Sequence, residues 1–254
     1  MGGDAGLGEA IRAAGGVTEL ARRIGISQPA VSNWSRIPAD SVAAVEAATG
    51  VARAVLRPDL YADATDDTTV ARAQEYALLA ALLAHPPDVA MLRRLARIEG
   101  DETPLGLAHQ ALAEAAAATD AAAVAREYFE LFIGVGRGEL LPYGSYYLTG
   151  FLHERPLAML RAELADLGIE RVEGQSEPED HAAILCEIMA GLIAGELAAP
   201  VERQQYFFDR HLAPWIRRFF ADLEAAKAAG FYRPVGVIGR VFIEIEAQAS
   251  AFTG

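Results

Sequence analysis

The chain has 254 residues, of which 52% are hydrophobic, and a formal net charge of −13. This apolar content allows a sizeable core and argues against a disordered chain. No uncharged apolar run reaches about 18 residues, and the first residues lack a basic segment followed by an apolar core, so neither a membrane span nor an export signal is expected. The single cysteine, Cys186, cannot form an internal disulfide, which suits the cytoplasm.

The charge is unevenly distributed along the chain. Residues 1–61 carry six Lys/Arg and six Asp/Glu, whereas the remaining residues carry 16 Lys/Arg and 29 Asp/Glu. A neutral segment followed by an acidic one predicts two domains with different partners. The small, polar residues that follow Tyr61 place the boundary. We therefore expect a first domain over 1–61, a linker over 62–69 and a second domain over 70–254.

Short helices separated by glycine are predicted in the first domain. A helix over 7–14 is followed by a second, which Thr18 can cap and Gly25 ends, and by a third, which Ser27 can cap. This is the pattern of a helix-turn-helix. The side chains expected to point outward from the third helix, where they could contact bases or phosphates, are Ser27, Gln28, Ser32 and Asn33.

The same stretch resembles the YdaS/Cro-like family of small DNA-binding domains. The segments that carry the resemblance are Ala14-Gly15-Gly16, Leu20-Ala21, Gly25-Ile26-Ser27-Gln28, Val31-Ser32-Asn33-Trp34, Arg36-Ile37-Pro38, Thr49-Gly50-Val51 and Leu56-Arg57-Pro58-Asp59. The resemblance implies DNA binding and adds Arg36 to the candidate contacts. A neutral domain lacks the phosphate-driven affinity of most DNA-binding proteins, so a docking or dimerisation element remains the alternative.

The rest of the chain is predicted to be helical throughout, which makes the fold all-α. Apolar spacing and Gly or Pro stops predict helices over 70–84, 88–98, 104–119, from 120 to about 133, 155–167, 181–197, 202–229 with a break at Pro214, and 235–252. No alternating strand pattern and no repeated β-α unit is present.

A glycine-rich segment follows the helix that starts at residue 120. Its run, Gly134-x-Gly136-x-Gly138, is preceded by no strand and followed by no Lys-Ser/Thr pair, so we predict a helix end and a loop rather than a phosphate site. The loop then places three tyrosines beside a proline and a glycine over 142–147. Such a loop could form a binding wall or could simply be anchored by half-buried tyrosines.

The most polar stretch in the helical region is Ser176-Glu177-Pro178-Glu179-Asp180-His181. Ser176 and Glu179 have capping-box spacing, and Pro178 fits a first helical turn, so a helix cap explains most of the segment. An Asp-His pair at the junction of two helical halves could also hold a ligand. Local chemistry leaves both interpretations open.

Residues 70–254 as a whole resemble the TorD/DmsD family of all-helical cytoplasmic chaperones for redox enzymes. The motifs are Glu127-Tyr128-x-x-Leu131-Phe132-x-Gly134, Leu141-Pro142-Tyr143-Gly144-Ser145-x-Tyr147, Glu177-Pro178-Glu179-Asp180-His181, Phe208-x-x-His211-Leu212-x-Pro214-Trp215 and Phe231-Tyr232. The resemblance implies a hinge near 174–181 and binding of the twin-arginine signal peptide and the apo form of a molybdopterin enzyme, by a monomer or a dimer. GTP binding, which has been associated with the family, lacks a phosphate-loop motif here.

The candidate peptide-binding residues are Leu131, Phe132, Pro142, Tyr143, Gly144, Ser145, Tyr147, Glu177, Glu179, Asp180 and His181. Carboxylates would hold the arginines, and the apolar and aromatic residues would form a groove for the adjacent apolar stretch. The five histidines have no metal-ligand spacing, and no catalytic triad or thiol–His pattern is present, so no enzyme is expected. The alternative function is a transcriptional regulator whose second domain senses a peptide or a client enzyme.

Overall fold

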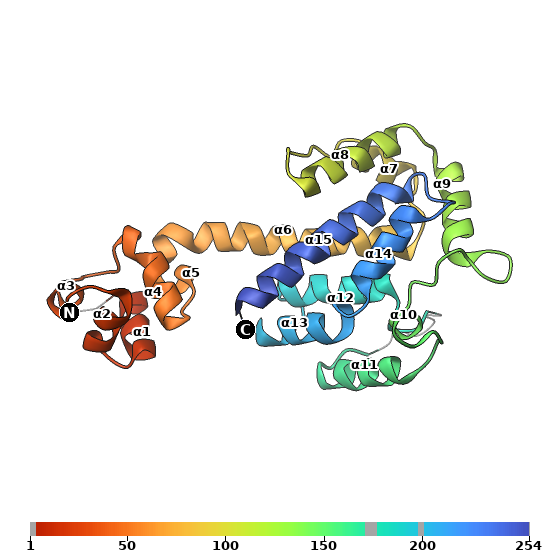
Figure 1. Ribbon diagram of the computed structural model, residues 1–254. Helices are drawn as coiled ribbons and strands as arrows, with labels where there is room; N and C mark the ends of the chain where they lie inside the picture. The colour runs from red at the N-terminus through yellow and green to blue at the C-terminus, as the bar shows by residue number, and fades with distance from the viewer. Residues whose placement is uncertain (1–3, 171–176, 198–200, 254) are drawn as a thin grey trace. The chain divides into compact units, whose positions relative to one another are not determined.

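The computed structural model describes residues 4–170, 177–197 and 201–253, and these are helical with connecting turns (Figure 1). The described residues contain no strand, only an isolated antiparallel bridge between Tyr143 and His181. The predicted all-α class is therefore confirmed. The chain forms two compact units, Met1–Ala71 and Arg72–Gly254.

The first unit contains the expected helix-turn-helix. Its helices are α1 (Ala5–Ala14), α2 (Val17–Ile24), α3 (Gln28–Ser32), α4 (Val42–Thr49) and α5 (Arg53–Leu56), with a 3-10 turn over Ala39–Ser41. Gly25 ends α2 with φ 74°, a left-handed conformation that glycine adopts without strain. Ser27 is the N-cap of α3, although its side chain makes no capping hydrogen bond, and Pro29 lies in the first turn. Thr18, expected as a cap, instead lies inside α2, which begins after Gly16.

One long helix, α6 (Pro58–Ala84), carries the backbone from the first unit into the second. It begins twelve residues before the expected start at residue 70, and the segment 62–69, predicted as a linker, has helical backbone. The reason is that no glycine or proline occurs between Pro58 and Ala84, so small polar residues alone do not end the helix. The division between the two units falls inside α6.

The second unit is a larger helical assembly. Its further helices are α7 (Val89–Leu95), α8 (Pro104–Ala117), α9 (Ala121–Tyr128), α10 (Gly144–Thr149), α11 (Arg155–Asp166), α12 (Ala182–Ala194), α13 (Val201–Phe207), α14 (Ile216–Ala225) and α15 (Tyr232–Thr253). Helix α12 corresponds to the helix predicted over 181–197, and nine of its residues, from Ala182 to Ile193, are buried. No helix in the described part of the chain is both long and apolar enough to cross a membrane.

An ion pair fixes α6 to α15 inside this unit. The Arg72 guanidinium donates from Nε and Nη2 to the two carboxylate oxygens of Glu246, at 2.7 and 2.8 Å, and the Tyr76 hydroxyl donates to Glu246 at 3.2 Å. Glu246 is buried, and the Arg72 guanidinium balances its charge inside the protein. Figure 1 shows α15 lying beside α14, and these two helices pack along their lengths.

Two helices widen into single π turns that the sequence analysis did not predict. Residues Phe129–Ile133 follow α9, and residues Phe208–Leu212 follow α13. A π turn inserts an extra residue and redirects the side chains after it, and such turns are frequent at functional sites. The predicted break at Pro214 is confirmed, because a short turn separates the second π turn from α14.

Candidate functional site

The acidic junction segment ends where α12 begins. His181 is the N-cap of α12, and its Nδ1 accepts a hydrogen bond from the Ala183 N–H at 3.1 Å. The helix begins at Ala182, so Pro178 precedes it, and the prediction that Pro178 lies in the first helical turn is wrong. Ser176, the other half of the predicted capping box, lies outside the described residues.

His181 is a neutral capping group. It is buried, and desolvation lowers the pKa of its imidazole to about 4, although the nearby carboxylates of Glu177 and Asp180 act in the opposite direction. At neutral pH the ring is uncharged, which its role as an acceptor at Nδ1 requires. His181 therefore supplies no positive charge to a ligand.

Backbone hydrogen bonds join the tyrosine loop to the junction segment. The Gly144 N–H donates to the Asp180 carbonyl at 2.9 Å, and the Ala182 N–H donates to the Pro142 carbonyl at 2.8 Å. The Tyr143 and His181 rings meet edge to face with centroids 5.1 Å apart. Two segments that are 35 residues apart, and that the sequence analysis had placed in one site, thus lie in direct contact.

A side-chain hydrogen bond also joins the two segments, because the Tyr143 hydroxyl donates to Glu177 Oε2. Partial burial and the Glu177 carboxylate raise the pKa of Tyr143 above its usual value, so the phenol stays protonated as a donor. Glu177 thus serves the protein's own structure.

Asp180 has one carboxylate oxygen satisfied and one without a partner. Oδ2 accepts from the Ser145 N–H at 2.7 Å, while Oδ1 is buried and makes no hydrogen bond within the described residues. Ser145 Oγ and His211 Nε2 are also buried and make no hydrogen bond within the described residues. Buried polar atoms are nearly always paired in folded proteins, so each of these three atoms is open to a hydrogen bond with a water or with a ligand.

Asp180 and His211 line a common cavity of about 110 Å³. Its other lining residues are Gly144, Leu148, Pro156, Met159, Leu160, Leu185, Arg210 and Trp215. Burial, with a smaller effect from Arg210, lowers the pKa of His211 to about 4, so the imidazole is neutral. The cavity therefore combines apolar walls with a carboxylate oxygen, a combination suited to one donor-bearing side chain.

The cavity wall explains why the loop motif has a glycine at position 144. A Cβ on Gly144 would lie 3.0 Å from Trp215 Nε1, so glycine lets the loop pass against the indole. The indole N–H itself donates to the His211 carbonyl at 2.7 Å. Arg210, the cation that lines the cavity, lies over the Tyr206 ring at 5.7 Å and makes no hydrogen bond with Asp180.

Glu179 faces a different part of the surface. Its Oε2 accepts from Arg161 Nε and Nη2 at 3.0 and 2.9 Å, so its charge is balanced within the protein. That Glu179 offers its charge to a ligand therefore stays a prediction, and a ligand would have to compete with Arg161 for it. Asp180 holds the partnerless oxygen, and Glu179 already has a guanidinium.

The predicted aromatic groove is only partly assembled. Leu131 is completely buried, so it supports the core and cannot line an exposed groove, because the π turn points it inward. Phe132 is half-buried, with its ring 5.5 Å from that of Tyr232. Tyr147 is half-buried, donates to Asp222 at 3.0 Å and lies 5.5 Å from the Trp215 ring. Of these residues, Tyr147 contacts the wall of the small cavity.

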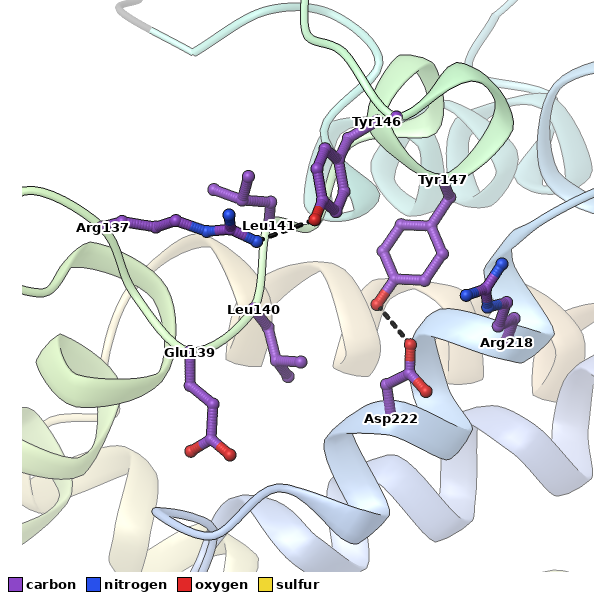
Figure 2. A pocket seen from close by; sticks show the side chains of 9 residues that line it. Arg137, Glu139, Leu140, Leu141, Tyr146, Tyr147, Arg218 and Asp222 are labelled. Carbon is purple, nitrogen blue, oxygen red and sulfur yellow. Dashed lines mark hydrogen bonds between the residues drawn. The ribbon is translucent and has the colours of Figure 1, made fainter.

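A second pocket, of about 340 Å³, lies beside Tyr147 (Figure 2). Arg137 Nη2 donates to the Tyr146 hydroxyl at 2.7 Å, and Arg218 lies over the Tyr147 ring at 5.7 Å. Glu139 and Asp222 also line it, so its charges are mixed. Of the residues that line this pocket, Tyr147 alone was predicted as a site residue. The three tyrosines at 143, 146 and 147 were the feature of the sequence that could have indicated the pocket.

The glycine-rich loop begins where the π turn after α9 ends. Gly134 caps the π turn with φ 61°, and its N–H donates to the Phe129 carbonyl at 2.7 Å. This agrees with the predicted helix end. In the described part of the chain no group of three His, Cys, Asp or Glu side chains could hold a metal ion. Cys186 is buried, and burial raises the pKa of its thiol to about 12, as fits a core residue.

The first unit presents a separate candidate surface on and after α3. The five predicted side chains Ser27, Gln28, Ser32, Asn33 and Arg36 are all exposed, as expected. Gln28 Nε2 donates to Ser32 Oγ at 2.8 Å, and Arg36 lies 3.3 Å from Asp59. The surface is polar and reachable, but its one arginine is partly neutralised.

Comparison with known proteins finds a family similar to part of each unit. Residues 99–221 match the family model described as nitrate reductase delta subunit, and residues 7–65 match the model described as bacterial toxin YdaS. The chaperone protein TorD of Vibrio cholerae is 28% identical over 130 residues, which cover 48% of this chain and 59% of that protein. TorD of Vibrio parahaemolyticus is 25% identical over 134 residues, covering 49% and 62%.

The chain thus spans about three fifths of the length of the curated relatives it matches. A crystal structure named as a redox enzyme maturation protein from Archaeoglobus fulgidus aligns with a TM-score of 0.46 and 20% identity, over 68% of this chain and 93% of that one. The two family resemblances inferred from the motifs are confirmed, in the expected order. The Vibrio relatives are named as chaperones rather than enzymes.

Proposed function

We propose that this chain, in which a domain of the TorD kind follows a YdaS-like domain, is a cytoplasmic chaperone for a molybdopterin-containing oxidoreductase. It binds the twin-arginine signal peptide of the precursor and holds the apo enzyme until the cofactor is inserted. The distant relationship to TorD supports the general role. The observation that carries the peptide-binding role is the buried Asp180 Oδ1, which lacks a partner and belongs to a residue that lines a cavity of about 110 Å³.

An arginine side chain matches this cavity chemically. The guanidinium offers five N–H donors, so one group could donate to Asp180 Oδ1 and to the neutral His211 Nε2 together. The apolar walls would exclude water, and a charge-assisted hydrogen bond gains strength in such surroundings. The volume admits a single side chain and is too small for a nucleotide, whose base, sugar and phosphates together need several hundred Å³.

The net charge of the second domain supports the same ligand. Residues 62–254 account for the whole net charge of −13, and a negative surface steers a basic peptide towards it. The complex should therefore weaken as salt rises, because salt screens this attraction over about 10 Å at 0.1 M.

Calorimetric titration of the full chain with leader peptides from the host's molybdenum enzymes tests the proposal. We expect a native leader to bind. A leader in which both arginines are changed to alanine should lose most of the affinity, and one in which both are changed to lysine should lose an intermediate amount, because an ammonium lacks the planar donor fork. If no leader binds while the mature apo enzyme does, signal-peptide recognition is wrong and only the general chaperone role remains.

A second candidate is a DNA-binding regulator, which the exposed polar side chains of α3 favour. In this case the second domain would sense the peptide or the client enzyme, and its negative charge would oppose phosphate binding. Residues 1–61 alone should then bind promoter DNA more tightly than the full chain at low salt. No mobility shift with either protein, while residues 1–61 alone are shown to be folded, would leave the helix-turn-helix as a docking or dimerisation element.

A further inference from the structure

An apolar groove of about 360 Å³ lies between α11 and α12, and its lining residues differ from those of the small cavity. Ile184, Glu187, Ile188 and Gly191 stand at positions i, i+3, i+4 and i+7, a spacing that places them on one side of α12. The remaining lining residues are Arg161, Leu164, Ala165, Ile169, Glu170, Glu179, Glu196 and Leu197. The groove therefore has a floor of branched aliphatic side chains and a rim of carboxylates.

The rim is strongly negative. Glu170, Glu187 and Glu196 are exposed, and none of them makes an ion pair or hydrogen bond within the described residues. Among the described residues that line the groove, the one cation is Arg161, and Glu179 already engages it. Three carboxylates without a cation around one apolar floor repel each other, and a basic partner would relieve that repulsion.

Consecutive residues connect this groove with the small cavity. Glu179 lines the groove and Asp180 lines the cavity, and adjacent Cα atoms are about 3.8 Å apart across a trans peptide bond. A single extended peptide could therefore occupy both places. This arrangement matches a ligand in which basic residues adjoin an apolar stretch.

We propose that the groove between α11 and α12 binds the apolar stretch of the leader whose arginine enters the Asp180 cavity. The occupant is an apolar peptide segment with flanking basic residues, chosen by the aliphatic floor and the negative rim. This inference rests on the proposed signal-peptide function. It adds a second, separate subsite and assigns specificity to Ile184, Glu187 and Gly191.

The test measures leader affinity by calorimetry on the full chain with paired variants. Ile184→Gln places a polar group on the floor, and Glu187→Lys reverses a rim charge on an exposed residue that has no partner. The controls are Leu107→Gln, at a more exposed apolar position on α8, and Asp166→Lys, which makes the same charge change at the end of α11 outside the groove.

We expect Ile184→Gln to weaken the leader about tenfold, and to leave unchanged the residual affinity of a leader whose apolar stretch has been made polar. Glu187→Lys should weaken binding about threefold more than Asp166→Lys at low salt, with the difference shrinking at high salt. Leu107→Gln should bind as the native chain does.

A third variant fills part of the groove and separates loss of binding from loss of folding. Gly191→Ala adds a methyl group to the groove floor, 3.2 Å from the Leu197 side chain, and alanine favours the helix. It should lower leader affinity at an unchanged or raised melting temperature. If the native leader binds all three groove variants as tightly as the two controls, the groove proposal is overturned and the proposed function stands. If no leader binds the native chain, the two proposals fail together.

Discussion

The two carboxylate oxygens of Asp180 have different roles, one in the structure of the protein and one in the proposed binding of a ligand. Its Oδ2 accepts the Ser145 N–H at 2.7 Å, and its Oδ1 is buried without a partner. Asp180→Asn keeps an oxygen for Ser145 and removes the charge, whereas Asp180→Ala removes both. The two variants therefore report different properties of the same position.

The magnitudes follow from these contacts. Asp180→Ala leaves a buried N–H unsatisfied, which costs about 1–3 kcal/mol of the free energy of unfolding. Asp180→Asn keeps that hydrogen bond and removes an incompletely paired buried charge, so the free energy of unfolding should change by less than about 1 kcal/mol. Either variant loses the charged acceptor for arginine. A hydrogen bond to a charged group contributes about 1.5–3 kcal/mol, so leader affinity should fall roughly ten- to hundredfold in both.

Urea unfolding followed by circular dichroism gives the stability, and calorimetry gives the affinity for the same preparations. Arg210→Gln is the matched control, because Arg210 lines the same cavity without contacting Asp180. Removing that cation should leave leader affinity unchanged or raise it. Native affinity in a folded Asp180→Asn protein would refute the reasoning, because the partnerless oxygen would then have no part in binding.

Three further predictions concern other parts of the chain. Because burial lowers the pKa of His181 to about 4, the unfolded chain binds more protons between pH 6.5 and 4, so this residue should lower stability by up to about 3 kcal/mol as the pH drops through the window. His181→Asn keeps a capping acceptor and should make the urea-midpoint profile shallower, leaving the part that His211 contributes in the same window. Glu246→Ala leaves Arg72 without its carboxylate and should cost about 3 kcal/mol in chemical unfolding, and a loss below 1 kcal/mol would contradict a structural ion pair. If the first domain binds DNA, Gln28→Ala with Asn33→Ala should remove the mobility shift without lowering the melting temperature, and an unchanged shift would exclude α3 as the reading helix.

The sequence by itself determined the helical class, the order of the two domains and the pairing of two distant motifs. Local chemistry is enough for the helical class, since Gly25, Pro214 and the apolar spacing of α12 act within a few residues of themselves, whereas the pairing of the two motifs followed from the family resemblance. The boundary was harder to place. Polar composition suggested a linker over 62–69, but helix continuation depends on the absence of a breaker, and α6 has none.

Only the tertiary structure decided how each site residue is used. Leu131 and Phe132 are neighbours in one motif, yet the π turn buries the first completely and leaves the second half-exposed. Glu179 and Asp180 are equivalent as carboxylates in the sequence. Arg161, 18 residues away, neutralises the first, and the Ser145 N–H, 35 residues away, satisfies only one oxygen of the second. The state of a charge depends on which groups surround it in space, and neither residue type nor spacing encodes those groups.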